Sequence, residues 1–382
     1  MDPQYIGRGS GVIYPHHASL AHIVPTSEPM DAQSQTGDGG HVDASVLVPV
    51  LNEERHISDS VAAMQAQRFD GALEFLFMDG RSEDRTKAIL EELAASDRRI
   101  RVFDNPGRSS TAGLNVGLRH ARGDYIVRMD AHTFYPEDYI ARGVERLRRG
   151  DVVWVAGPQV PYGVGTWSRR VALALGSWFG TGGSARWGAD GSGAAGGERE
   201  LDTGVFAGLW LRSTVQEHGG WDEGWPINQD SELAARVLRS GGRIVSIPEL
   251  AARYVPRDSL RGLARQYWRY GNYRAKTAAR HPESLDARHL FAPLLAIAAV
   301  GAVLAPAPIR TGARAALGVY AVGVGIASVR TLGQAAASDA AALPVVYAVM
   351  HGSWGFGFLV GSVRFGPPLA ALARIVRRLG SA

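Results

Sequence analysis

The 382-residue chain contains no cysteine, which excludes a disulfide framework and a thiolate metal site. This absence fits a reducing cytosol. Residues 1–41 lack hydrophobic periodicity and are rich in Gly, Ser, Gln, His and Pro, so we expect a disordered tail there. A secretory signal peptide has a basic start, then an apolar core, and then a cleavage site with small residues. The tail does not show these three parts, so it does not resemble a signal peptide.

Charged residues are missing from three stretches in the C-terminal part, namely residues 290–309, 315–329 and 340–363. A helix needs about 17–25 mostly apolar residues to span a bilayer. The first and third stretches reach this length, whereas the second is short and contains glycines. We therefore predict a membrane protein with a soluble front half.

A basic segment precedes these apolar stretches. Residues 253–280 contain eight Lys or Arg and a single acid, Asp258. Four arginines recur at intervals of four, and Leu and Tyr side chains lie between them: Arg257, Arg261, Arg265 and Arg269, with Leu260, Leu263, Tyr267 and Tyr270. This pattern predicts an amphipathic helix at the membrane interface, with a solvated charged face as the alternative.

The net charge of +4 and the pI near 9.4 also suit a phosphate-bearing partner. We expect no nucleic acid, because the basic segment leads directly into the apolar stretches. The predicted organisation is a tail at 1–41, a front domain at 42–257, a basic interface region at 258–285 and a membrane domain at 286–382. The membrane domain would contain two or three hydrophobic spans.

Strands and helices alternate in the front domain. Apolar runs predict strands at Ala44–Val50, Leu73–Asp79, Ile100–Phe103 and Asp124–Asp130. Helices are expected after Asn52, which could cap the first, from Ser82 onward, and over residues 109–121. This order predicts an α/β domain with a largely parallel sheet.

Two carboxylates, Asp79 and Asp130, follow predicted strands, where such sheets gather ligands. Each alone could be a turn residue. A dinucleotide-binding domain would need G-x-G-x-x-G after the first strand, but the chain reads "PVLNEE" there. The carboxylates of this loop would repel a pyrophosphate. A metal ion at Asp130 and His132 could hold a diphosphate instead.

With these residues assembled, the chain resembles glycosyltransferase family 2, whose inverting members have a GT-A nucleotide-sugar domain. The matching stretches span roughly residues 43–257 and read "SVLVPVLNEE", "EFLFMDGRSEDRT", "NPGRSSTAGLNVGLRHARGDYIVRMDAH" and "GGWDEGWPINQDSELAARVLRSGGRI". Within the family, the chain is most similar to membrane-anchored exopolysaccharide glycosyltransferases of the succinoglycan type. The resemblance implies a GT-A fold followed by C-terminal transmembrane helices.

The resemblance also implies roles for individual residues. Pro49 and Glu53 would contact the nucleoside, and Asp79 would accept a hydrogen bond from uracil. Asp130 would begin the acidic motif that grips the donor diphosphate through a divalent metal. Asp230, in "NQDSE", falls at the position of the catalytic base that deprotonates the acceptor hydroxyl.

The chain departs from the family pattern at two positions. His132 stands where the metal motif often has a second Asp, which favours Mn²⁺ over Mg²⁺ because Mg²⁺ prefers oxygen ligands. Its alternative role is a hydrogen bond to a donor phosphate. Gln229 stands where the base motif often has Glu, and it could orient Asp230 without replacing it.

Further substrate-binding candidates lie outside these motifs. Arg108 could meet a donor phosphate or sugar, and Asp202 could bind the acceptor, although a solvated arginine and a structural hydrogen bond are equally simple explanations. The glycine-rich residues 182–197 are expected to form a flexible loop. "RQYWRYG" loosely resembles the Gln-x-x-Arg-Trp element of processive relatives, which would place Gln266, Trp268 and Arg269 near acceptor and diphosphate.

These residues together predict an inverting glycosyltransferase anchored in the inner (plasma) membrane, with its catalytic domain in the cytoplasm. It would transfer a sugar from a UDP-sugar to a polyprenyl-diphosphate-linked saccharide during synthesis of an exopolysaccharide or cell-envelope glycan. One alternative is a polyprenyl-phosphate sugar transferase, in which a lipid phosphate is the nucleophile. Another is an inactive membrane protein that binds nucleotide sugars.

Charge outside the apolar stretches predicts how many of them cross the membrane. Three crossings would place six arginines on the side disfavoured by the positive-inside rule: Arg310, Arg314, Arg364, Arg374, Arg377 and Arg378. A re-entrant or interfacial second stretch would misplace only Arg310, Arg314 and Arg330. We therefore expect two crossings and an amphipathic helix over Leu369–Leu379, although snorkelling by Arg314 and Arg330 would permit a third.

Overall fold

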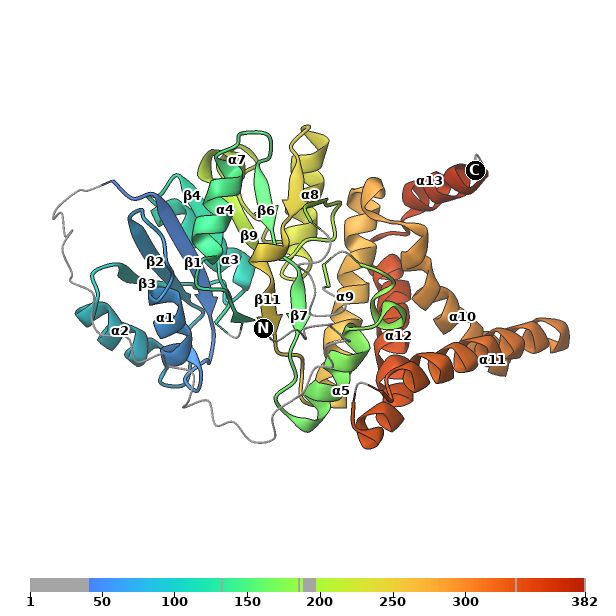
Figure 1. The fold of residues 1–382 in the computed structure, drawn as a ribbon. Coiled ribbons are helices and arrows are strands. Elements are labelled where there is room, and N and C mark those ends of the chain that lie inside the picture. The colour runs from blue at the N-terminus through green and yellow to red at the C-terminus, as the bar shows by residue number, and fades with distance from the viewer. Residues whose placement is uncertain (1–40, 132, 185, 188–196, 334, 381–382) are drawn as a thin grey trace, which may run out of the picture.

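The structure, a computed structural model, describes residues 41–131, 133–184, 186–187, 197–333 and 335–380. An α/β unit and a helical unit lie side by side (Figure 1). Nearly all of the predicted tail, residue 132 and most of the glycine-rich loop lie outside the described residues.

The predicted mostly parallel sheet is confirmed. Its eight strands have the order β3-β2-β1-β4-β9-β6-β10-β8, and β1 to β4 are mutually parallel while β9 runs antiparallel to β4 and β6. The strands are β1 Ala44–Val50, β2 Leu73–Asp79, β3 Ile100–Asp104, β4 Tyr125–Arg128, β6 Trp154–Ala156, β8 Arg199–Glu200, β9 Gly208–Leu211 and β10 Ile244–Ser246. A second sheet contains β5 Thr133–Phe134, β11 Ala252–Tyr254 and β7 Gln159–Pro161.

Helices cover both faces of the large sheet. Its apolar strands are buried on both sides, as is typical of a parallel sheet. Helices α1, α2 and α4 pack on one face, and α3, α7 and α8 pack on the other. The helices of this unit are α1 Ile57–Gln65, α2 Thr86–Ser96, α3 Ser110–His120, α4 Tyr139–Leu147, α5 Thr166–Leu175, α6 Trp178–Thr181, α7 Arg212–Glu217 and α8 Gln229–Arg239.

The loops after β1 and β2 differ from their prediction. Asn52 does not cap a helix, because α1 begins at Ile57 and Asn52 adopts a positive φ of 56°. Its side chain accepts a hydrogen bond from the Glu83 N–H at 2.8 Å, and its own N–H donates to Ser82 Oγ at 2.9 Å. These bonds join the two loops, so Ser82 and Glu83 belong to the loop and α2 begins only at Thr86.

The helical unit follows the front domain. Its elements are α9 Leu260–Arg280, α10 Phe291–Leu304, α11 Ala307–Arg330, α12 Ala337–Phe365 and α13 Leu369–Gly380, with the short 3₁₀ helices η3 Pro282–Ser284 and η4 Ala287–Leu290; a further 3₁₀ helix, η2 Pro248–Leu250, lies between β10 and β11 of the front domain. Among the described residues, three helices are long and apolar enough to cross a membrane: Ala287–Leu304, Ala307–Arg330 and Ala337–Phe365. The second apolar stretch therefore belongs to a continuous helix of 24 residues, longer than its uncharged run.

Helices α9 and α12 lie together along most of their length (Figure 1). Glycines permit this close approach, as is common between membrane-associated helices. A Cβ atom at Gly271 would lie 2.0 Å from the Trp354 carbonyl oxygen, and one at Gly357 would lie 2.3 Å from the Trp268 carbonyl oxygen. Since the arginines predicted to form the basic stripe of α9 are exposed, α9 cannot lie in hydrocarbon, and α12 lies beside it.

Helix α12 and the helix after it contact elements that precede α10. Near its start, Asp339 accepts a hydrogen bond from Arg170 of α5 at 3.0 Å. Beyond its end, Arg374 of α13 donates to the carbonyl oxygens of Glu283 and Leu285 at 2.8 Å. These two residues directly precede α10. We propose from these contacts that the chain before α10 and the chain after α12 lie on the same side of the membrane, with α10 and α11 as the two crossings.

We expect reporter insertions to reveal this arrangement. A reporter active only on the side opposite the catalytic half should give a signal in the turn between α10 and α11, at Ala305. It should stay silent after Leu332, between α11 and α12, and at the C-terminus. A signal after Leu332 would instead support a re-entrant second stretch, and a signal at the C-terminus would support three crossings.

Candidate functional site

The carboxyl ends of β1, β2 and β4 place the predicted donor residues at one edge of the sheet. Pro49 pairs with Met78 in the parallel register, and Val50 pairs with Asp79. Asp79 is buried, and its carboxylate accepts the Ser82 N–H at 3.1 Å. Asp130 follows β4 two residues after Arg128, and its N–H donates to the Tyr135 hydroxyl at 2.8 Å.

A buried arginine, which the sequence reasoning did not single out, joins the two principal carboxylates. Arg128 donates from Nε to Asp130 Oδ1 at 3.0 Å and from Nη2 to Asp130 Oδ2 at 3.3 Å. Its Nη1 donates to both oxygens of Asp230, at 2.8 and 3.0 Å. The proposed metal ligand and the proposed base therefore share one guanidinium, although 100 residues separate them in the sequence (230 − 130).

Electrostatics explains why this cation stays charged inside the protein. Burial acts to lower the pKa of Arg128, but the charges of Asp130 and Asp230 outweigh it and raise the pKa above its ordinary value. Burial and the charge of Asp130 likewise raise the pKa of Tyr135, which keeps its hydroxyl protonated. The side chains of Arg128, Asp130 and Asp230 are 6%, 13% and 10% exposed, so water screens their interactions only weakly.

The other residues predicted to bind the nucleotide sugar or to assist the base lie in neighbouring loops and at the start of α8. The Glu53 N–H donates to Thr86 Oγ1 at 2.7 Å, which fixes this loop beside β2. Arg108 is exposed, has a φ of 54°, and donates to Glu83 at 3.1 Å. Gln229 begins α8 and is buried next to Asp230. His132 lies outside the described residues.

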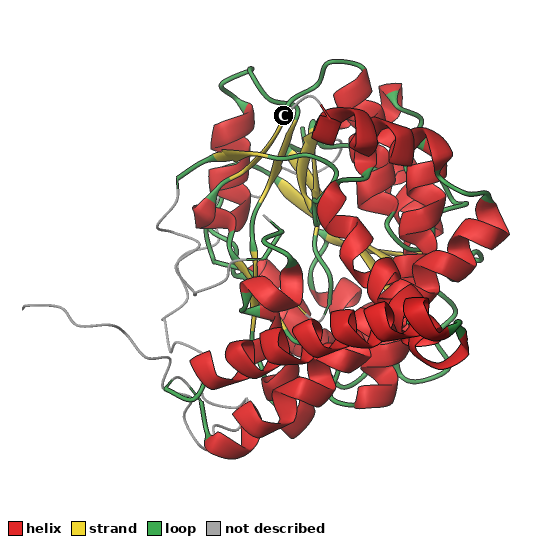
Figure 2. Cartoon of the chain, turned by 90° about the vertical axis from the view of Figure 1, so that its right-hand side faces the viewer, coloured by secondary structure: helices red, strands yellow, loops and turns green. Residues whose placement is uncertain are grey.

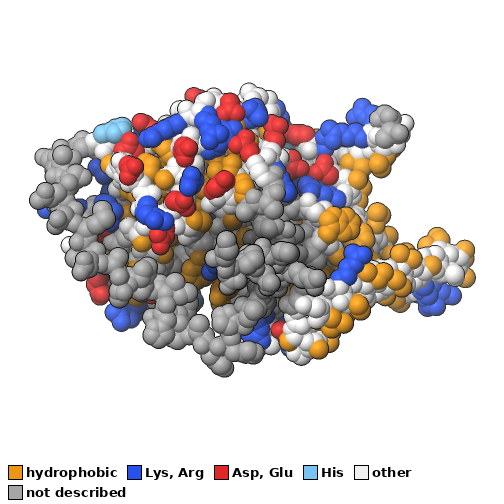
Figure 3. Space-filling view, in the orientation of Figure 1, with side chains coloured by type: hydrophobic (Ala, Val, Ile, Leu, Met, Phe, Trp, Pro, Cys, Tyr) orange, Lys and Arg blue, Asp and Glu red, His pale blue; other side chains and the backbone are white. Residues whose placement is uncertain are grey.

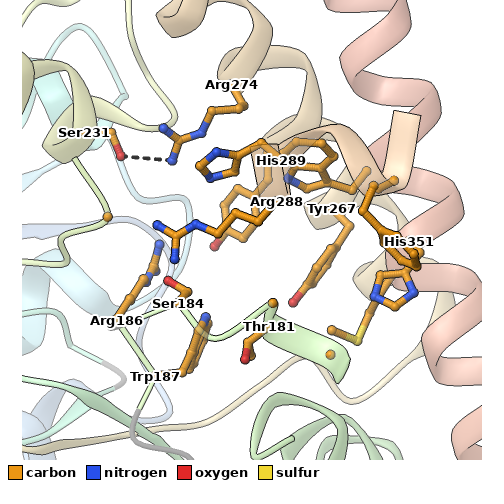
Figure 4. A pocket seen from close by; sticks show the side chains of 18 of the residues that line it. Thr181, Ser184, Arg186, Trp187, Ser231, Tyr267, Arg274, Arg288, His289 and His351 are labelled. Atoms are coloured by element: carbon orange, nitrogen blue, oxygen red, sulfur yellow. Dashed lines mark hydrogen bonds between the residues drawn. The ribbon is translucent and has the colours of Figure 1, made fainter. Parts of the chain in front are cut away.

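A cavity of about 460 Å³ lies near the start of α8 (Figure 4). Its lining includes Asn228 and Ser231, which flank Gln229 and Asp230 at the start of α8, and also Asp202. Asp202 accepts hydrogen bonds from the Gly204 N–H at 2.7 Å and from Arg288 at 3.2 Å. The structure therefore places Asp202 in the cavity, as an acceptor-binding role requires.

The structure does not bring the "RQYWRYG" residues to this cavity as a group. The Gln266 amide donates to the hydroxyls of Tyr254 and Tyr270, at 2.9 and 3.0 Å, so Gln266 supports the wall behind Tyr270. Trp268 and Arg269 are exposed on α9 and do not line the cavity.

A divalent metal ion bound at Asp130 would need oxygen or nitrogen ligands close together. Among the described residues, no group of three His, Cys, Asp or Glu is arranged to hold a metal ion. Asp130 nevertheless supplies a carboxylate at a strand end, beside a second carboxylate on the same guanidinium. This fits a metal that takes one or two protein carboxylates and completes its shell with substrate phosphates.

Comparisons with known proteins identify the family of the chain. The model of "Glycosyl transferase family 2" matches residues 45–199. The chain is 34% identical over 325 residues to the succinoglycan biosynthesis protein ExoA of Rhizobium meliloti, covering 82% of this chain and 93% of that protein.

Two further proteins show more distant similarity. A dolichyl N-acetyl-α-D-glucosaminyl phosphate 3-β-D-2,3-diacetamido-2,3-dideoxy-β-D-glucuronosyltransferase of Methanococcus voltae is 24% identical over 239 residues, covering 59% of this chain and 71% of that protein. The solved structure of a mannosyltransferase from Pyrobaculum calidifontis, in complex with GDP-Man and Mn²⁺, superposes with a TM-score of 0.51 at 19% identity, covering 86% and 88% of the two chains. This likeness concerns the fold alone.

We expect Arg128 to be essential to the stability of the site. Arg128→Met would leave two buried carboxylates without their shared cation, which should lower the free energy of unfolding by about 3–5 kcal/mol. Thermal unfolding of the purified full chain in detergent would measure this loss. Added Mn²⁺ should stabilise Arg128→Met more than wild type, because a metal ion can replace the missing positive charge.

The matched control is Arg142→Met, which removes an exposed arginine from an ion pair with Asp138. It should change the stability by no more than about 0.5 kcal/mol. Equal stability losses in the two variants would show that the Arg128 contacts contribute no more to the free energy of unfolding than a surface ion pair does.

Proposed function

Since this chain belongs to glycosyltransferase family 2, we propose that it transfers a sugar, with inversion, from a UDP-sugar to a lipid-diphosphate-linked saccharide. The observation that carries this proposal is the position of Asp230. It shares the Arg128 guanidinium with the strand-end carboxylate of Asp130, and its neighbours Asn228 and Ser231 line the cavity. A base for transfer between two substrates needs a position next to both.

The donor would occupy the edge formed by β1, β2 and β4. Pro49, Glu53 and Asp79 would contact the nucleoside, and Arg108 could reach a phosphate if it exchanged Glu83 for the donor. Asp130 and His132 would hold Mn²⁺ or Mg²⁺, which neutralises the diphosphate and makes UDP a better leaving group.

The acceptor would approach from the cavity. Asp230 takes the proton of its attacking hydroxyl, and the hydroxyl oxygen forms the new bond to the anomeric carbon as the bond to UDP breaks. Arg128 orients the Asp230 carboxylate through two hydrogen bonds, and Gln229 begins α8 beside it. Asp202 is available for a sugar hydroxyl of the acceptor.

The relatives support a setting in glycan assembly at a membrane. One relative is named for succinoglycan biosynthesis, and another for transfer to a dolichyl-linked sugar phosphate. We propose that this chain serves the synthesis of an exopolysaccharide or cell-envelope glycan. Its three apolar helices fit the inner membrane, with the catalytic half in the cytoplasm, where nucleotide sugars are available.

The base assignment predicts that Asp230→Asn retains donor binding but loses about 10²–10⁴ in the rate of transfer. The rate would be measured with radiolabelled UDP-sugars and lipid extract as acceptor. Asp70→Asn is the matched control, because it removes the same negative charge from an exposed position of the front domain. Near-wild-type turnover of Asp230→Asn would instead fit a polyprenyl-phosphate sugar transferase, whose phosphate nucleophile needs no base.

The donor assignment predicts two different losses of UDP affinity by calorimetry. Asp130→Ala should abolish the Mn²⁺-dependent part of the affinity, and His132→Ala should weaken it less. Asp79→Ala should reduce UDP affinity with or without Mn²⁺, because its proposed partner is the uracil ring. If wild type binds UDP equally well with a chelator present, Asp130 and His132 do not serve a metal.

A further inference from the structure

Three arginines from separate parts of the chain line the cavity beside Asp230. Arg186 precedes Trp187, Arg274 belongs to α9, and Arg288 belongs to η4. Figure 4 shows their guanidinium groups gathered on one side of the cavity, near Ser231, while His351 lies on the opposite side. The sequence offers no pattern that joins these three positions.

The charges on this wall are not balanced. The only carboxylate in the lining of the described cavity is Asp202, which pairs with Arg288 at 3.2 Å. Arg186 donates to the neutral Gln159 amide at 2.7 Å. Arg274 makes two long hydrogen bonds of 3.4 Å, to Ser231 Oγ and the Ser284 carbonyl oxygen. Arg288 also lies 3.5 Å from Asp286, which is outside the lining, so three arginines share two carboxylates and both of these pair with Arg288.

Arg274 is partly buried and lies near the other two arginines of this wall. Burial lowers its pKa to about 10; the nearby carboxylate of Asp202 opposes this shift, whereas the positive charges of Arg288 and Arg186 add to it. A dianionic or trianionic ligand between the three guanidinium groups would remove this repulsion. Arginine forks match the oxygens of phosphate groups in geometry as well as in charge.

The mouth of the cavity is apolar and lies where the candidate membrane helices meet. Trp178 of α6 is 73% exposed and Phe291 at the start of α10 is 47% exposed, and both line the cavity. Met350 and Trp354 of α12 complete this side. The space-filling view shows apolar side chains gathered on the helical unit (Figure 3). A cationic wall and an apolar mouth suit a phosphate attached to a hydrocarbon chain.

We propose that this cavity binds the diphosphate of an isoprenoid-linked acceptor, with Arg186, Arg274 and Arg288 on the phosphate oxygens and the isoprenoid chain leaving between α6 and α10. The identity of the ligand rests on the proposed function, since the ligand is its acceptor. The cavity is distinct from the donor site, because Asp79 and Asp130 do not line it. The saccharide beyond the diphosphate would lie against Asn228 and Ser231, within reach of the base.

The test is the binding of geranylgeranyl diphosphate to the purified full chain in detergent, with no donor and no transfer. Wild type should bind this probe, and saturating UDP with Mn²⁺ should not displace it. Arg274→Gln should weaken binding at least about tenfold, as expected for the loss of one charge-assisted hydrogen bond. Arg186→Gln should weaken it similarly. Arg119→Gln, an exposed arginine on α3, is the matched control and should bind normally.

These measurements distinguish a failure of the cavity assignment from a failure of the proposed function. UDP affinity measured on the same samples shows that a variant is folded, so a loss of probe binding with normal UDP binding supports the cavity. Displacement of the probe by UDP would make the cavity part of the donor site and overturn the proposal. Equal competition by phosphatidylglycerol would overturn it in favour of a general phospholipid site. Probe binding without any transferase activity would leave the cavity assignment standing and refute the proposed function.

Discussion

The Arg128 guanidinium, held between Asp130 and Asp230, is the interaction on which the rest of the site depends. Removing three charged groups from water is expensive, and only their mutual hydrogen bonds offset that cost. The contacts fix the end of β4 against the start of α8, two elements that are distant in sequence. Under the proposed function, the same carboxylates would face a metal ion and the acceptor hydroxyl.

Under the proposed function, the surrounding fold would connect the membrane surface with the nucleotide site. The sheet presents Asp79 and Asp130 at one edge, and α8 carries Asp230 to the boundary with the cavity. Helix α9 closes that cavity with Tyr267, Tyr270 and Arg274, and the same helix packs on α12 through glycines. The view from the helical unit shows its helices layered in front of the strands (Figure 2). A lipid-borne acceptor would therefore reach the base without leaving the membrane surface.

Local patterns predicted the strands well and the site only in part. Ala44–Val50 and Leu73–Asp79 were predicted to the residue, because continuous β-branched and apolar runs leave little choice to a buried strand. The prediction that Asn52 caps a helix was wrong, because its side chain accepts a hydrogen bond from the loop after β2 instead. Arg128 is a charge that ends an apolar strand, a signal that could have marked it. Arg186, Arg274 and Arg288 meet only through tertiary packing, which no local pattern reports.

The most direct test is a cryo-electron microscopy structure with UDP, Mn²⁺ and an isoprenyl diphosphate bound together. The account predicts uracil beside Asp79, the metal at Asp130, the isoprenyl diphosphate on Arg274 and Arg288, and Asp230 facing the space between the two ligands while still bonded to Arg128. Density for both diphosphates in one place, or an Asp230 turned away from that space, would contradict the claim that this residue joins two separate sites.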